Sequence, residues 1–146
     1  MTKYICIDPG KCKCGLIFAD FKSKRVMKAI VLESGYLVQN IKTFMGKDKN
    51  IKVLIGNGTT SKQHVKSLSF LENNLTIVEE KNTTYRSRQR YFEIFPIKGI
   101  KRFLPRDVFL RNINLDAISA LVILEDYLNC KFTLNCDNLS KTWMKQ

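Results

Sequence analysis

The sequence predicts an α/β domain with a mixed five-stranded sheet and helices on both faces. Three observations support this fold class. Three short apolar runs open the chain, two later apolar runs each follow a stretch with helical spacing, and a strongly apolar helical pattern comes last. Short connectors favour antiparallel pairs, and alternating strands and helices favour parallel ones. The 146 residues suit one domain, so we expect a single domain over residues 1–146.

The first three predicted strands form an antiparallel meander. They are Tyr4–Ile7, Leu16–Ala19 and Val26–Leu32. The first ends at Asp8-Pro9-Gly10, because Pro and Gly interrupt regular structure. The connectors at 11–15 and 20–25 are short and mostly polar, which is typical of turns between neighbouring antiparallel strands.

The remaining chain alternates between helices and strands. The predicted elements are a helix around 37–45, a strand at 53–55, a helix at about 61–71, a strand at 75–78, a helix from Thr83 or Thr84 to Phe92, an irregular segment at 93–111, and a helix from about Leu115 to Leu128. Right-handed crossovers give the strand order 3-2-1-4-5. The last helix is apolar on nearly every face, which predicts that it is buried.

The charge balance points to an anionic partner. Lys and Arg number 25 against 13 Asp and Glu, a formal net charge of +12, and residues 81–111 hold nine basic and two acidic side chains. Such a chain attracts polyanions, of which nucleic acid is the commonest. A solvated surface kept for solubility is the plainer interpretation, but solubility does not require the charges to be clustered.

Cysteine usage and hydropathy indicate a cytosolic protein. The five Cys are an odd number, and the N-terminus is too short and polar for an export signal, which disfavours a secreted disulfide framework. No run approaches the roughly 20 apolar residues of a membrane span. We therefore expect a cytoplasmic location and no membrane partner.

Acidic residues stand at the ends of three separate elements. Asp8 follows the first strand, Glu79 and Glu80 follow the fifth, and Asp116 opens the last helix. The carboxyl ends of parallel strands lie at one edge of a sheet, so these groups are expected to meet there. Clustered carboxylates repel one another, and Mg²⁺, which prefers oxygen ligands, relieves that repulsion. A turn residue, loop charges and a helix-dipole partner are the plainer interpretations.

Basic and aromatic residues interleave beyond this cluster. Arg86 and Arg90 share a helix face and are predicted to contact phosphates. Tyr85, Tyr91, Phe92 and Phe95 could stack on bases, although aromatic residues at such spacing more often pack in a core.

The ordered motifs resemble a known family. ICIDPGKCKCGLIFAD resembles the first hairpin of the YqgF/RuvC-like group of the ribonuclease H-like superfamily, VEEKNTT its D-E-R-x-T-T stretch, and LDAISALVILEDYL its final helix. RSRQRYFEIFPIKGIKRFLP resembles an Arg-aromatic-Pro-Gly-Arg insertion of some members. Glu79 stands where the group usually has Asp, and Lys81 where it has Arg.

This resemblance implies a fold, an activity and a set of site residues. The fold would be ribonuclease H-like. Asp8, Glu80 and Asp116 would be catalytic metal ligands for Mg²⁺ (Mn²⁺ would also serve), with Glu79 as the other candidate for the Glu position. Apart from the resemblance, we expect Thr84, Arg86, Arg90, Lys101 and Arg102 to bind nucleic acid. The implied activity is endonucleolytic, either maturation of a ribosomal RNA precursor or resolution of Holliday junctions.

Two other functional classes stay open from the sequence. A nucleic-acid-binding module that has lost catalysis would need the basic residues without the metal. An actin-like or sugar kinase-like ATP-binding protein would share a related hairpin, but it would need two such domains, and the chain supplies one. The sequence does not choose between RNA and DNA, or between a monomer and a homodimer.

Overall fold

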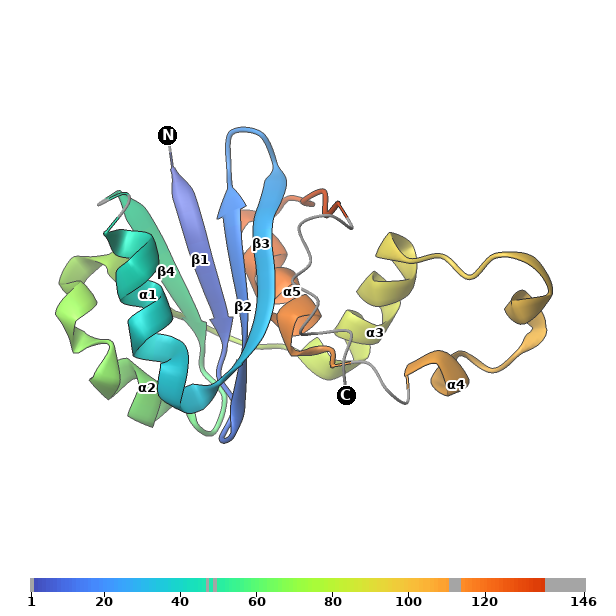
Figure 1. The fold of residues 1–146 in the computed structure, drawn as a ribbon, viewed down its shortest axis with the longest axis horizontal. Coiled ribbons are helices and arrows are strands. Elements are labelled where there is room, and N and C mark those ends of the chain that lie inside the picture. Colours follow the sequence, from blue (N-terminus) through green and yellow to red (C-terminus); the bar gives the residue numbers. More distant parts are fainter. Residues whose placement is uncertain (1, 47, 49, 111–113, 136–146) are drawn as a thin grey trace.

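The computed structural model describes residues 2–46, 48, 50–110 and 114–135, and its centre is a five-stranded sheet in the order β3-β2-β1-β4-β5 (Figure 1). The strands are β1 (Lys3–Asp8), β2 (Lys13–Asp20), β3 (Arg25–Glu33), β4 (Ile51–Gly56) and β5 (Leu75–Val78). β1 pairs antiparallel with β2 and parallel with β4, β2 pairs antiparallel with β3, and β4 pairs parallel with β5. The predicted order and directions are confirmed.

The helices follow the expected sequence of elements with one addition. They are α1 (Leu37–Met45), α2 (Ser61–Ser67), α3 (Thr83–Ile94), α4 (Arg106–Leu110) and α5 (Asp116–Leu128), with 3-10 turns η1 (Ser34–Tyr36), η2 (Ser69–Asn74) and η3 (Gly99–Phe103). The segment at 93–111, expected to be irregular, contains the end of α3 and both η3 and α4. Pro105 stands directly before α4, a position that suits proline because its fixed φ matches the first turn of a helix.

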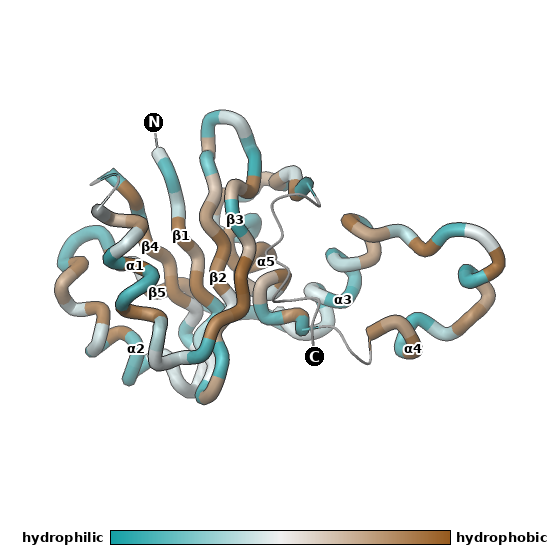
Figure 2. The backbone as a smooth tube through the Cα atoms, in the orientation of Figure 1, coloured by the Kyte–Doolittle hydropathy of each residue, from teal (hydrophilic) through white to brown (hydrophobic). Residues whose placement is uncertain are grey.

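Two apolar cores lie on opposite faces of the sheet. Ile5 and Ile7 pack on the face covered by α1, α2 and η2, and Tyr4 and Cys6 pack on the face covered by α5. Figure 2 shows hydrophobic residues along the strands between these layers, with more hydrophilic residues in the outer helices and loops. All residues of α5 from 117 to 125 are buried, as its apolar pattern predicts. Helices on both faces are therefore confirmed.

The alternation of side chains along each strand decides which face receives the polar residues. Successive side chains of a strand point to opposite faces, so Asp8 shares the face of Tyr4 and Cys6. By the same rule Gly56 shares the face of Leu54, which packs with α5. The carboxyl ends of β1 and β4 thus present their last residues to the α5 side of the sheet.

The chain beyond α3 leaves the layered body. Figure 1 shows the segment after α3 projecting away from the sheet, turning at η3 and returning through α4. We call residues 95–110 the arm. Among the described residues, no helix is long and apolar enough to cross a bilayer.

Candidate metal and nucleic-acid site

A glycine brings Asp116 to the edge where Asp8 lies. Asp8 pairs with Gly15 across β1 and β2. A Cβ atom on Gly15 would lie 1.9 Å from the carbonyl oxygen of Asp116. The backbone at the start of α5 therefore rests directly on β2, beside the strand residue that faces Asp8. Only a residue without a side chain permits this approach.

A second glycine makes room for Glu80. A Cβ atom on Gly56 would lie 1.7 Å from Glu80 Oε1. The backbone N–H of Glu80 donates to Asn57 Oδ1 (3.0 Å), and the N–H of Asn57 donates to Val78 O (2.9 Å). The turn after β4 thereby fixes the residues that follow β5, and the Glu80 carboxylate lies over the end of β4.

The sequence left open whether Glu79 or Glu80 belongs to the acidic site, and the two side chains differ in the structure. The Glu79 side chain is 67% exposed, and its carboxylate pairs with Lys81 Nζ at 3.3 Å. Glu80, in contrast, is half-buried, and its charge helps to raise the pKa of Asp8. Glu80 has the same parity as Val78, which packs against the α5-side core. That parity is a signal in the sequence that favours Glu80.

Asp8, Glu80 and Asp116, which we call the acidic cluster, all bind protons more tightly than isolated carboxyl groups do. Burial, then the charges of Glu80 and Asp116, raise the pKa of Asp8 to about 7, and a hydrogen bond from Ser119 partly opposes this rise. Burial also raises the pKa of Glu80 and that of Asp116. Burial and mutual repulsion therefore disfavour the ionised form of these carboxyl groups. Binding of a proton or a cation relieves that repulsion.

The donor set suits a hydrated Mg²⁺ ion. Glu80 Oε1 is buried and has no hydrogen-bond partner among the described residues. Within that part of the chain, no three His, Cys, Asp or Glu side chains form a ready-made metal cage. Mg²⁺ usually takes only one or two carboxylates and completes its shell with water and substrate phosphate. The acidic oxygens present therefore fit this ion, with an incomplete protein shell.

Polar side chains hold the loop that follows Asp8. Thr60 Oγ1 donates to Pro9 O (3.0 Å), and Ser34 Oγ donates to Gly10 O (2.9 Å). His64 Nε2 lies 3.0 Å from the same Gly10 oxygen. The imidazole of His64 therefore helps to hold this loop.

Two residues of the site were missed by sequence reasoning. Ser119 lies three positions after Asp116 on α5, a spacing that places both on one helix face, and its hydroxyl bonds to Asp8. Ser119 Oγ also lies 2.8 Å from Ser87 Oγ on α3. Lys13 is the second, because burial raises the pKa of Asp116 and the charge of Lys13 opposes that rise, after a hydrogen bond with Asn114. Its position opposite the Asp8 loop depends on the hairpin register, which the sequence does not fix.

Two of the predicted nucleic-acid-binding arginines form ion pairs within the chain, one of them half-exposed and the other mostly buried. Arg86 binds both carboxylate oxygens of Asp126. Arg90, with a side chain only 11% exposed, donates to Glu125 (2.7 and 3.0 Å) and to Phe132 O (2.8 Å). The shared helix face is as predicted, but it faces the acidic end of α5. We therefore leave Arg90 out of the proposed nucleic-acid surface.

The other three predicted contact residues lie in the open. Thr84 and Glu80 both line a cavity of about 400 Å³ at the start of α3, so this threonine is close to the acidic cluster. Lys101 and Arg102 are exposed on the arm. A larger cavity of about 760 Å³ lies between α3 and α5, where Arg86, Arg90 and Glu125 line it, away from Asp8.

The interleaved aromatic residues divide into two groups. Tyr91 packs against Phe92 and Phe95, with ring centroids 5.3 and 5.0 Å apart. Tyr85 is exposed near the Thr84 cavity. The packing interpretation thus describes the end of α3, and Tyr85 alone of the four presents an open ring near the acidic cluster.

Comparison with solved structures supports the fold. The chain resembles RuvC of T. thermophilus, solved in complex with a Holliday junction substrate, with a TM-score of 0.51 over 88% of this chain and 96% of that one. The two sequences are 11% identical, so the likeness concerns the fold. No family model matches the chain, and no curated protein does. The fold is therefore ribonuclease H-like, as predicted.

Proposed function

We propose that the protein is a metal-dependent endonuclease that hydrolyses phosphodiester bonds in structured nucleic acid. One observation carries the proposal. Carboxyl groups at the end of β1, after β5 and at the start of α5 each have a raised pKa, with the charges of Glu80 and Asp116 contributing to that of Asp8, and among the described residues the buried Glu80 Oε1 has no hydrogen-bond partner. The net charge of +12 favours an anionic substrate.

Asp8, Glu80 and Asp116 would hold Mg²⁺, and Mn²⁺ would also fit. The bound ion would neutralise phosphate charge and lower the pKa of a coordinated water. The chain's own residues orient these ligands. Ser119 fixes the Asp8 carboxyl, and Asn57 fixes the backbone of Glu80. Lys13 supplies a positive charge beside Asp116 that would help to position a phosphate.

The substrate class follows from the fold and from the earlier resemblance. The structural neighbour was solved with a Holliday junction, which favours branched DNA. The YqgF-like motifs favour a ribosomal RNA precursor instead. Both substrates are structured polyanions, and both are compatible with a cytoplasmic protein acting as a monomer or a homodimer.

A binding module without catalysis is the second candidate. It is favoured by the incomplete convergence of the acidic side chains, since no three of them form a metal cage among the described residues. Glu79 in place of the family's Asp agrees with it. Such a protein would bind the same nucleic acids with equal affinity in Mg²⁺ and in chelator, and it would not cut them.

The adjacent glutamates provide a matched pair for the test. Labelled ribosomal RNA precursor, four-way DNA junction and single strands are incubated with Mg²⁺ or with EDTA. We expect Glu80→Gln to reduce cleavage by at least about a hundredfold, because it removes a charged ligand from the cluster. Glu79→Gln, which changes an exposed carboxylate one residue away, should cut at the wild-type rate.

Three outcomes separate the candidates. Cleavage by wild type and by Glu79→Gln, but not by Glu80→Gln or Asp8→Asn, supports the nuclease. Binding without cleavage by any of the proteins supports the module. If Glu80→Gln cuts as well as wild type in Mg²⁺, the acidic cluster is not the active site.

A further inference from the structure

The tip of the arm carries exposed apolar side chains that the layered body does not use. Ile100 is 87% exposed and Phe103 is 85% exposed, and both belong to η3. Lys101 and Arg102 lie between them in the chain and are exposed as well. Single exposed apolar residues are ordinary, but an aromatic residue this open beside two cations marks a contact surface.

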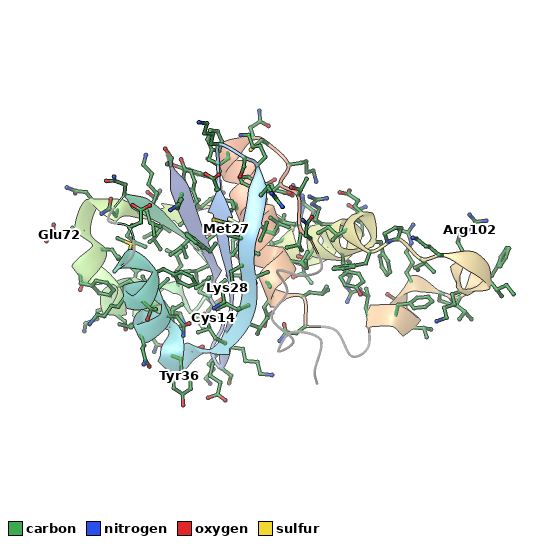
Figure 3. The ribbon with its side chains drawn as sticks, turned by 45° about the horizontal axis from the view of Figure 1, so that its top comes forward. Cys14, Met27, Lys28, Tyr36, Glu72 and Arg102 are labelled. Atoms are coloured by element: carbon green, nitrogen blue, oxygen red, sulfur yellow. The ribbon has the colours of Figure 1, made fainter. Side chains whose placement is uncertain are left out.

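The base of the arm is fixed while its tip is open. The Arg106 guanidinium lies 5.3 Å from the centroid of the Phe92 ring on α3, and Asp107 lies 3.7 Å from Arg88 of the same helix. These contacts tie the start of α4 back to α3. η3 lies beyond them, and Figure 3 shows Arg102 at the end of the arm farthest from the sheet. The structure thus presents Phe103 and its basic neighbours away from the body.

Charge decides which kind of partner this tip fits. Residues 96–110 contain four basic residues and one acidic residue. A second copy of the chain would place like charges together, and the cores of protein interfaces are depleted of charge. An anionic membrane would accept the charge, but peripheral binding uses longer amphipathic helices than the five-residue pieces here. Single-stranded nucleic acid fits best, because it offers phosphates to the cations and base faces to the ring.

We propose that the arm tip is a binding site for unpaired nucleotides, in which Phe103 stacks on a base and Lys101 and Arg102 contact the flanking phosphates. The inference rests on the proposed action on nucleic acid, and it names the feature that is recognised. Fully paired duplex hides its base faces within the stack. A junction, a loop or a strand end exposes them, so the arm would direct the protein to such structures.

Binding in EDTA tests this site independently of cleavage. Fluorescence anisotropy is measured with a labelled single strand, a four-way junction with an unpaired loop, and a fully paired duplex. We expect Phe103→Ala to weaken binding to the first two by roughly tenfold, and binding to the duplex by no more than about twofold. Phe103→Trp should restore the affinity. Ile100→Ala is the matched control, since it removes an equally exposed side chain without a ring.

Salt dependence tests the two cations. Lys101→Ala and Arg102→Ala together should make the slope of log affinity against log salt shallower by about 1.4 for a single strand, which is about 0.7 for each lost phosphate contact. A 2-aminopurine base placed in the strand should be quenched by wild type and by Phe103→Trp, and not by Phe103→Ala.

Each failure has a separate meaning. If Phe103→Ala binds all three nucleic acids as wild type does, the tip site is wrong, and Glu80→Gln still decides the nuclease. If Ile100→Ala and Phe103→Ala weaken binding equally, the tip is an apolar contact and not a stacking site. Binding to phosphatidylserine vesicles that needs Phe103, with unchanged nucleic-acid binding, would make the partner a membrane. If wild type binds no nucleic acid, both proposals fail.

Discussion

The two faces of the sheet are made by the same strands but differ in what they bury. On the side of α1, α2 and η2, the core residues of β1, β2 and β4 are mainly aliphatic. On the α5 side, the strand ends carry Asp8, Gly15 and Gly56, and the helix contributes Asp116 and Ser119. Apolar packing stabilises both faces, but the α5 side also holds like charges close together. Repulsion between these carboxylates costs stability on the α5 side, which is the cost expected of a site kept for function.

The largest expected effect on stability comes from Gly15→Ala, which blocks the close contact between α5 and β2. The Cβ of Gly15→Ala would lie 1.9 Å from Asp116 O, 2.1 Å from Asp116 C and 2.7 Å from Ala117 N, all of them backbone atoms. The helix must move, because no side-chain rotation relieves the clash. We expect the free energy of unfolding to fall by about 4 kcal/mol, as severe overpacking and core disruption do. Urea denaturation followed by circular dichroism measures it.

Gly35→Ala is the control for this substitution. A Cβ atom there would meet nothing within 4 Å, so its unfolding midpoint should stay near that of wild type. Equal stability of Gly15→Ala and Gly35→Ala would show that α5 does not rest on β2 at this point. The acidic cluster would then lose the contact that brings Asp116 to it.

The sequence was sufficient to predict the sheet but not the full site. Apolar runs and short connectors predicted all five strands and their order, because buried strands and turns have local signatures. The first four strands extend further than predicted, since residues such as Lys3 and Lys13 pair with neighbours without being apolar, whereas β5 has the predicted bounds. α4 was missed because a five-residue helix has too few positions to show a period.

The partners of charged residues depend on contacts that are distant in the sequence. The helix pattern correctly placed Arg86 and Arg90 on one face, but it could not show that Asp126 and Glu125 cover that face from 35 to 40 residues away. In contrast, the alternation of side chains from Val78 predicts the face on which Glu80 lies, and the i, i+3 spacing from Asp116 predicts the helix face of Ser119. Those two signals were present in the sequence, whereas the ion pairs needed the structure.

A smaller effect on stability is expected from Asp8→Asn, which removes one of the repelling charges on the α5 side. In EDTA, the pKa of Asp8 is about 7 in the folded protein, above its ordinary value of 3.8. The folded state therefore binds more protons between these values, so stability falls as pH rises from about 4 to 7 and is level above that. Asp8→Asn removes the contribution of Asp8 to this dependence, while Glu80 and Asp116, whose pKa values are also raised, keep theirs. At pH 8 we expect the variant to be more stable by about 2 kcal/mol, which is less than the full shift implies because Asp8 is partly exposed.

The difference between the two proteins isolates this group from other carboxyls. The pKa values of Asp20 and Asp48 are lowered by their hydrogen bonds, and they contribute equally to both proteins. At pH 4 the two unfolding free energies should coincide, and they should separate with rising pH. Adding Mg²⁺ at pH 8 should stabilise wild type alone. A constant difference across this range would contradict the charge repulsion at Asp8.

The smallest effect on stability, and the sharpest on function, is expected from Gly56→Ala. The three atoms nearest to the new Cβ all belong to the Glu80 side chain, with Oε1 at 1.7 Å, Cδ at 2.6 Å and Cγ at 2.9 Å, so a movement of that side chain relieves the clash. An alanine at the end of a strand also costs less backbone entropy than glycine. We expect stability to change by less than about 1 kcal/mol. Stabilisation by Mg²⁺, and with it cleavage, should be lost.

Gly58→Ala is the matched control, because its Cβ would lie 3.5 Å from Glu80 Oε2, an ordinary contact. It changes the same turn and should leave the response to Mg²⁺ intact. If Gly56→Ala also keeps that response, the carboxylate of Glu80 is not needed where the structure places it. If only Gly56→Ala loses the response, the site can be removed while the fold stays intact. The α5 side would then be shown to hold a function that its packing does not require.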